Sequence, residues 1–134
     1  MSQLQFELVS PEKLVVNQPV AMVTVPDGEG DYGVLPGHAP LITTVRAGVI
    51  DIYADNDNTI SNRIFVAGGF AEVTGERCTV LAEEAVPVAD LNRGNLESAA
   101  KDLAEDLALA KNEHERAALE KQIAVVSAKL QAVA

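Results

Sequence analysis

The sequence predicts an α+β fold in which an antiparallel β-sandwich is followed by an antiparallel two-helix hairpin. Three observations lead to this prediction. Turn residues divide the first 86 residues into short segments of about ten residues, the composition changes after Pro87, and the rest carries two apolar stripes of helical spacing. A chain of 134 residues suffices for one compact domain and a small appendage. We therefore expect a β-sandwich over residues 1–87 and a helical hairpin over residues 88–134.

Alternating apolar and polar residues predict strands in the N-terminal part. Leu4, Phe6 and Leu8 alternate with polar residues, a pattern typical of a half-buried strand rather than of a signal peptide. Pro26-Asp27-Gly28 has the composition of a turn, and residues 55–58 are expected to close a hairpin. The expected strands are residues 4–9, 20–25, 41–45, 48–53, 63–67, 70–73 and 79–82.

After Pro87, Ala, Leu, Glu and Lys dominate, which are residues of high helix propensity. Asn112, followed three residues later by Glu115, predicts an N-cap and a capping box between two helices. Two helices of about 20 residues bury little area, so the hairpin needs a second surface, either the sandwich or a partner. Its two stripes are Leu96, Ala100, Leu103, Leu107 and Ala110, and Leu119, Ile123, Val126, Leu130 and Val133.

The charge of the protein restricts its partners. Its formal net charge is −10, of which residues 1–88 carry −8 from 12 acidic and four basic side chains. An acidic surface repels phosphate backbones and anionic lipid, so we expect no binding to nucleic acid or directly to a bilayer. The single Cys78 cannot form an internal disulfide and is expected to be a small buried hydrophobe, which fits a cytoplasmic location.

Residues 28–33 match the dinucleotide-binding pattern GxGxxG and follow a predicted strand. A true motif of this kind opens a helix whose N-terminal amides bind the pyrophosphate. Pro36 and Pro40 forbid that helix here, and the carboxylates of residues 27–31 would repel phosphate. We therefore interpret the glycines as parts of a sharply turning acidic loop.

Catalytic and metal centres are not expected. The candidate ligands His38, His114 and Cys78 are widely separated in the sequence, and zinc requires several clustered ligands. Asp55 and Asp57 resemble the start of a calcium loop, but Ile60 occupies the position that requires glycine. No GxSxG or Cys–His arrangement is present. The protein is therefore expected to bind, couple or regulate rather than catalyse.

Several segments resemble the epsilon subunit family of bacterial F-type ATP synthases, whose mitochondrial counterpart is called delta. The most specific is residues 29–40, which read EGDYGVLPGHAP. Others occur in the order and spacing of the family: residues 6–11 (FELVSP), 41–44 (LITT), 47–50 (AGVI), 65–73 (FVAGGFAEV) and 79–82 (TVLA).

The resemblance implies a sandwich of about ten strands and two helices in the central stalk, beside the gamma subunit. It also implies that the acidic loop and the His38 region face the membrane-embedded ring of c subunits. The candidate ring contacts are Glu29, Gly30, Asp31, Tyr32 and His38.

The resemblance further implies that the hairpin folds against the sandwich or extends toward the catalytic α/β head, where it restrains ATP hydrolysis. Some members bind ATP through Ile-Asp-x-x-Arg-Ala. Asp90 and Arg93 match this motif and are candidate ATP contacts, but Ala89 and Gly94 depart from it. We therefore expect no cofactor and interpret Asp90 as the N-cap of the first helix.

The sequence thus predicts a non-catalytic rotor subunit that couples gamma to the c ring and limits hydrolysis through its hairpin. Its expected location is peripheral, on the cytoplasmic face of the bacterial plasma membrane. The alternative is a free-standing β-sandwich binding module with a helical cap.

Overall fold

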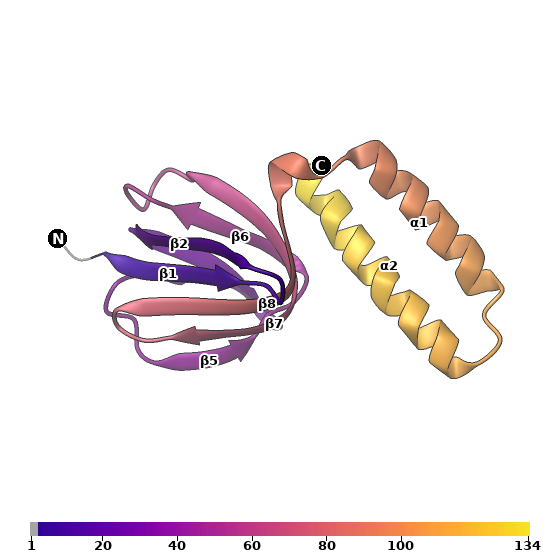
Figure 1. The fold of residues 1–134 in the computed structure, drawn as a ribbon, viewed down its shortest axis with the longest axis horizontal. Coiled ribbons are helices and arrows are strands. Elements are labelled where there is room, and N and C mark those ends of the chain that lie inside the picture. The colour runs from indigo at the N-terminus through magenta and orange to yellow at the C-terminus, as the bar shows by residue number, and fades with distance from the viewer. Residues whose placement is uncertain (1–2) are drawn as a thin grey trace. The chain divides into compact units, whose positions relative to one another are not determined.

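The computed structural model describes residues 3–134, which form eight strands, one 3₁₀ turn and two helices (Figure 1). The protein divides between Ala89 and Asp90 into two compact units. The first holds all the strands and the second holds both helices. The predicted α+β class, with strands first and a helical hairpin second, is confirmed.

The strands form one sheet in the order β2-β1-β8-β7-β6-β3-β4, with β5 pairing to β7. All pairs are antiparallel except β1 with β8, so the sheet is mixed rather than purely antiparallel. The bounds are β1 (Leu4–Val9), β2 (Leu14–Val20), β3 (Met22–Asp27), β4 (Gly30–Val34), β5 (Leu41–Thr44), β6 (Gly48–Tyr53), β7 (Asn62–Val73) and β8 (Arg77–Pro87).

Strand β7 bends at Gly68 and Gly69, which have φ angles of 72° and 103°. The part before the bend pairs with β6 and the part after it pairs with β5, so one strand serves two regions of the sheet. A bridge between Asp27 and Val45 brings the end of β3 close to the end of β5. The sheet therefore curls around a single core.

The core is mainly aliphatic. The inward residues of β1 are fully buried, and Cys78 is 0% exposed and forms no disulfide. The prediction that Cys78 behaves as a small buried hydrophobe is confirmed. The largest fully buried side chains of the core cluster are Leu4, Phe6, Leu8, Ile50, Ile52 and Ile64.

The predicted strands differ from the observed ones in their number and in some of their bounds. Strands β1 and β6 have the expected bounds, and the segments 63–67 and 70–73 are two parts of β7. The described residues form eight strands rather than about ten. The segments of β2 and β4 were not predicted as strands. Both lie at sheet edges, where Pro19 of β2 and the glycines of β4 are tolerated because one side makes no ladder bonds.

The 3₁₀ turn η1 (Val88–Asp90) spans the boundary between the two units, and α1 (Arg93–Ala108) and α2 (Glu113–Val133) follow in the second unit. Asn92, not Asp90, caps α1, because its side chain accepts a 2.9 Å hydrogen bond from the Asn95 amide. The prediction that Asp90 is the N-cap was wrong, since η1 delays the start of the helix by two residues.

Asn112 caps α2 as predicted, accepting from the Glu115 amide at 2.8 Å. The Glu115 carboxylate accepts in return from the Lys111 amide at 2.9 Å, one residue before the position that a regular capping box uses.

The ten residues of the two predicted stripes are all among the less exposed positions of the hairpin. Leu96 is buried and the other nine are half-buried. A seam of this kind removes only part of each side chain from water, so the pair of helices gains little from burial. In the part of the sequence that the structure describes, neither helix is long and apolar enough to span a membrane.

Candidate functional site

The acidic glycine segment forms a β-hairpin. Asp27 of β3 pairs with Gly30 of β4, and only Gly28 and Glu29 lie between the two strands. Gly30 has a φ of 142°, a conformation that favours glycine. The expected loop is therefore the tip of a hairpin followed by strand β4. No helix opens after the glycines, as the interpretation of the GxGxxG match requires.

Arg46, which the sequence analysis did not single out, holds this tip. Its Nε donates to the Asp27 carbonyl at 2.8 Å, and its Nη1 donates to the Ala47 carbonyl at 3.3 Å. Its Nη2 forms an ion pair with the Asp31 carboxylate. One signal was available in the sequence: Lys13 and Arg46 are the only cations in residues 1–62.

Tyr32 and His38 are placed differently from the tip. The Tyr32 hydroxyl lies 2.7 Å from Thr43 Oγ1, and its ring packs against the core. Burial raises the pKa of Tyr32, while the hydrogen bond to Thr43 opposes the shift. His38 Nδ1 lies 2.7 Å from the Ala39 carbonyl oxygen, so this nitrogen carries the proton in that bond. The two rings are 6.4 Å apart and tilted by 42°.

The predicted ring contacts are therefore not one cluster. Glu29, Gly30 and Asp31 surround the hairpin tip, whereas His38 follows the opposite end of β4. The connector that holds His38 is fixed by Gly37, whose amide donates to the Gly75 carbonyl at 2.7 Å. Gly37 has a φ of 87°, a conformation that favours glycine, and forms the turn between Pro36 and Pro40.

The two candidate ATP contacts, Asp90 and Arg93, have different structural roles. Asp90 ends η1, and Arg93 is the first residue of α1. The Arg93 guanidinium donates to the Val133 carbonyl at 3.1 Å, so it satisfies an otherwise free carbonyl at the end of α2. Residues 3–134 hold no group of three or more His, Cys, Asp or Glu side chains able to bind a metal.

A second surface, also not predicted, lies on the outer side of β1, β7 and β8. Phe70 pairs with Leu81, and Leu81 pairs with Val9, so the three side chains are neighbours across three strands. Phe70 is 44% exposed and Leu81 39% exposed. With Pro11 they line a groove of about 430 Å³. We call Val9, Pro11, Phe70 and Leu81 the outer apolar face.

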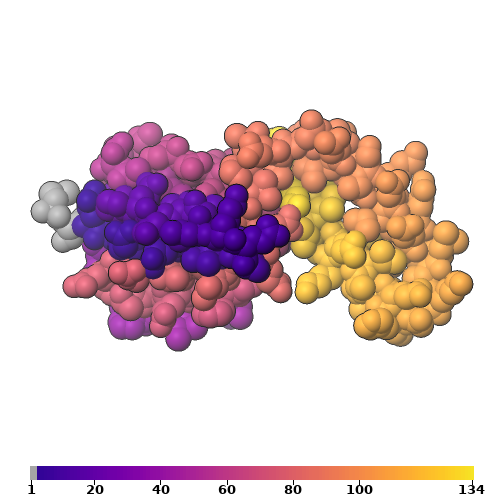
Figure 2. Space-filling model, viewed as in Figure 1, coloured from indigo at the N-terminus to yellow at the C-terminus, as the bar shows by residue number. Residues whose placement is uncertain are grey.

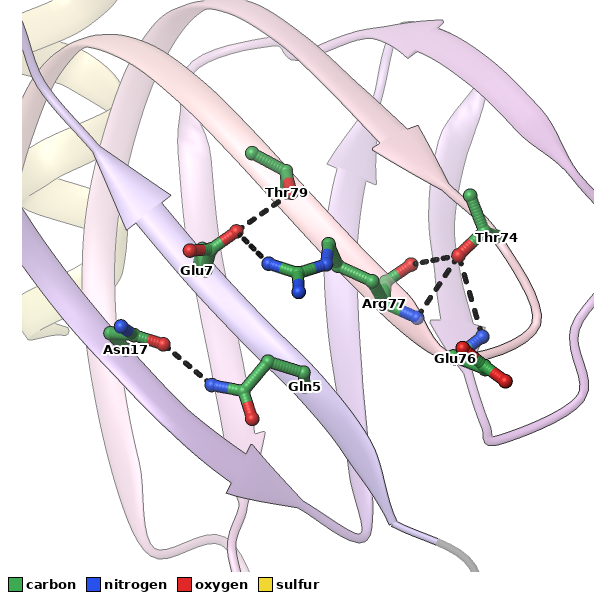
Figure 3. A network of polar contacts seen from close by, with 7 residues as sticks. All are labelled: Gln5, Glu7, Asn17, Thr74, Glu76, Arg77 and Thr79. Atoms are coloured by element: carbon green, nitrogen blue, oxygen red, sulfur yellow. Dashed lines mark hydrogen bonds and ion pairs between the residues drawn. The ribbon is translucent and has the colours of Figure 1, made fainter.

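Polar residues lie on β1 and β8, the strands that also carry Val9 and Leu81. Figure 3 shows the contacts of these polar residues. The Arg77 guanidinium donates to Glu7 at 2.6 Å, and the Thr79 hydroxyl donates to the same carboxylate at 3.3 Å. Gln5 donates to Asn17 at 2.5 Å across β1 and β2. In Figure 2 the indigo residues of β1 and β2 form a continuous surface beside the salmon residues of β8. The surface thus combines an apolar groove with a hydrogen-bonded polar border.

These features define a class of protein, a β-sandwich domain followed by a helical hairpin. The family comparisons agree on both units. Residues 3–88 match the family model of the β-sandwich domain of the ATP synthase delta/epsilon chain. Residues 92–134 match the model of the C-terminal domain of the ATP synthase epsilon chain. The protein belongs to the ATP synthase epsilon chain family, which confirms the resemblance inferred from residues 29–40.

Curated relatives match nearly the whole sequence. The ATP synthase epsilon chain of Rhodospirillum centenum is 58% identical over 135 residues, covering 98% of this protein and 92% of the relative. That of Paramagnetospirillum magneticum is 51% identical over 132 residues, covering 98% of each.

Solved structures share the fold at low identity. A subunit of the Euglena gracilis mitochondrial ATP synthase (OSCP, F1 and c-ring) superposes with a TM-score of 0.86 at 21% identity, covering 100% of this protein and 83% of the other. A subunit of the central stalk and c-ring of the Tetrahymena thermophila mitochondrial enzyme gives 0.66 at 13%, covering 98% and 96%.

Proposed function

We propose that this protein is a non-catalytic rotor subunit that binds the gamma subunit through the outer apolar face and the c ring through the β3–β4 hairpin. The observation that carries the proposal is the exposure of Phe70 and Leu81 side by side on a sheet surface. Contiguous exposed apolar side chains are costly in water and mark interaction surfaces.

The layout of this surface supports a protein partner. Interfaces have an apolar centre and a polar rim, and here the groove at Phe70 and Leu81 is bordered by the Glu7–Arg77–Thr79 network. Since residues 1–88 carry a net charge of −8, a partner with basic residues around an apolar strip fits best. The gamma shaft is the proposed occupant, because the family is that of a subunit of the same complex.

The ring contact is proposed at the β3–β4 hairpin, where the sequence resemblance had placed it. Glu29 and Asp31 are exposed at the tip of a hairpin, which can reach a neighbouring subunit without rearrangement of the sheet. Tyr32 and His38 are half-buried and support this hairpin and the connector after it.

The hairpin of helices is proposed as the regulatory element, in transient contact with the α/β head. Its half-buried seam supports this role, because an element of low stability can move between two conformations at a small cost in free energy. The complex, rather than a spanning segment of this protein, would then hold the subunit at the cytoplasmic face of the membrane.

The gamma contact is tested by Phe70→Glu, with Ile60→Glu as the matched control. Phe70 is 44% exposed and Ile60 is 42% exposed, but Ile60 lies in the β6–β7 connection, away from the groove. Titration with purified gamma subunit should show affinity reduced at least about 30-fold by Phe70→Glu, the size of an interface hot spot. The control should bind as the unmodified protein does.

Two results would contradict the gamma contact. One is wild-type affinity of the Phe70→Glu variant, and the other is equal loss in both variants. Absence of any association with gamma would favour the free-standing binding module. The regulatory role has its own test, since adding the protein to an epsilon-free catalytic sector should lower ATP hydrolysis, and unchanged turnover at saturation would refute inhibition.

A further inference from the structure

The tip of the β3–β4 hairpin is held more firmly than a two-residue turn requires. Beyond the ladder bonds of the hairpin, the Arg46 amide donates to the Pro26 carbonyl at 3.1 Å. The Arg46 side chain adds bonds to the Asp27 and Ala47 carbonyls and an ion pair with Asp31. One residue from outside the hairpin thus contacts β3, β4 and the residue before β6.

The contacts of Arg46 give the two exposed carboxylates at the tip, Glu29 and Asp31, different states. Asp31 is paired with the Arg46 guanidinium. Glu29, in the turn itself, is exposed, and no hydrogen bond or ion pair to it occurs among residues 3–134. Of the two exposed carboxylates at the tip, only Glu29 therefore offers an uncompensated negative charge, and it does so on a backbone that the Arg46–Asp31 pair fixes; Asp27 is half-buried.

Gly48 provides the space that this arrangement needs. A Cβ atom at this position would lie 2.9 Å from Arg46 Nη1 and 2.9 Å from Pro26 Cβ. Such distances are too short for a real side chain, so the guanidinium lies where only glycine leaves room for it. Arg46, Gly48 and Pro26 together form a packed corner behind the tip.

We propose that Arg46 is a positioning residue that holds the β3–β4 tip in its binding orientation, so that Glu29 forms the ion pair with a basic group on the c ring. This inference rests on the proposed ring contact and assigns separate roles to two carboxylates. A tip that is ordered before binding loses less conformational entropy on contact, and therefore binds more tightly than a free one. Asp31 contributes through Arg46 rather than by touching the ring.

The test measures two quantities on the full-length protein: hydrogen exchange of the β3–β4 amides in the free state, and affinity for purified c ring in detergent. Arg46→Ala and Asp31→Asn should each speed exchange at residues 27–31 and weaken ring binding. The affinity for the ring should fall about tenfold. Glu29→Gln should weaken ring binding without changing the exchange. Arg46→Lys should restore part of both losses, because lysine keeps the charge but not the two-pronged geometry.

Two further variants separate position from charge. Gly48→Ala displaces the guanidinium while keeping it charged, and should behave as Arg46→Ala does. Arg63→Ala is the matched control, because it removes a 3.1 Å ion pair between a similarly exposed arginine and Asp51 on another part of the sheet. It should change neither the exchange of residues 27–31 nor ring binding, and gamma binding should be unchanged in every variant.

The outcomes separate this inference from the proposed function. If Arg46→Ala exchanges as Arg63→Ala does, Arg46 does not hold the tip and the inference is wrong, even if the unmodified protein binds the ring. If exchange changes as expected but the unmodified protein does not bind the ring, the proposed ring contact is refuted. The proposed role of Arg46 in ring binding is then refuted as well. Loss of ring binding in Asp31→Asn without faster exchange would make Asp31 a direct contact.

Discussion

Gly69, at the bend of β7, should tolerate no side chain. Its φ of 103° is a conformation that residues with a Cβ rarely adopt. A Cβ built there would overlap the carbonyl oxygen of Leu81 on β8 and lie 2.8 Å from its carbonyl carbon. Gly69→Ala therefore adds backbone strain and a clash with a neighbouring strand, both at the point that places Phe70 on the outer apolar face.

The two contributions can be estimated separately. Unfavourable backbone angles cost about 1–3 kcal/mol, and an added carbon in a packed position costs about 1–3 kcal/mol. Gly69→Ala should thus lower the free energy of unfolding by about 4 kcal/mol. Gly37→Ala is the matched control, because Gly37 has a φ of 87° but no atom within 4 Å of the place that a Cβ would take. The free energy of unfolding of Gly37→Ala should fall only by the backbone contribution, about 1–2 kcal/mol.

Cys78 provides the assay. It is 0% exposed, and burial raises its pKa to about 12, so it reacts with a thiol reagent only when the sandwich opens. When closing is fast, the labelling rate follows the population of the open form. Gly69→Ala should raise this rate about 1,000-fold and Gly37→Ala about 10-fold, at about tenfold per 1.4 kcal/mol. Equal rates in the two variants, or a rate for Gly69→Ala within about twofold of the unmodified protein, would refute the steric argument.

Two other predictions concern titration and nucleotide binding. The folded protein keeps the Cys78 thiol protonated to about pH 12, whereas the unfolded state loses this proton from about pH 9.0, so stability should fall as the pH rises through that window. Urea unfolding should show that the stability difference between the unmodified protein and Cys78→Ala shrinks above about pH 9, and a constant difference would contradict the assignment. Because Arg93 is bonded to Val133, calorimetric titration with ATP should give no binding heat. Micromolar ATP affinity that is lost in Arg93→Ala would overturn this prediction.

The local sequence pattern was sufficient to predict the structure where the environment of a residue is set by its own helix or strand. The alternation at Leu4, Phe6 and Leu8 predicts β1 because each of these side chains faces the same core. The stripes of the two helices and the Asn112 cap follow in the same way, since both depend on residues within four positions of each other.

Prediction failed where two local signals competed or where the deciding contact was distant in sequence. Asp90 and Asn92 are both good N-caps, and the turn η1 decides between them. Phe70 faces outward because Ala71 and Val73 face inward. The alternation of residues 70–73 thus already indicated an exposed Phe70, and with it the outer apolar face. Arg46 bonds to Asp27, 19 residues earlier, and no local pattern records such a contact.

The case of Asp31 shows why a charge count does not locate a binding site. By count, the carboxylates of residues 27–31 form one acidic segment that repels phosphate and attracts a basic partner. In the folded protein, Asp31 is compensated by Arg46, and a compensated carboxylate attracts a distant cation weakly. The attraction that remains comes from exposed groups without a partner, and the exposed carboxylate of this kind at the tip is Glu29. Pairing in the fold, rather than the number of acids, therefore determines which side chain a partner subunit meets.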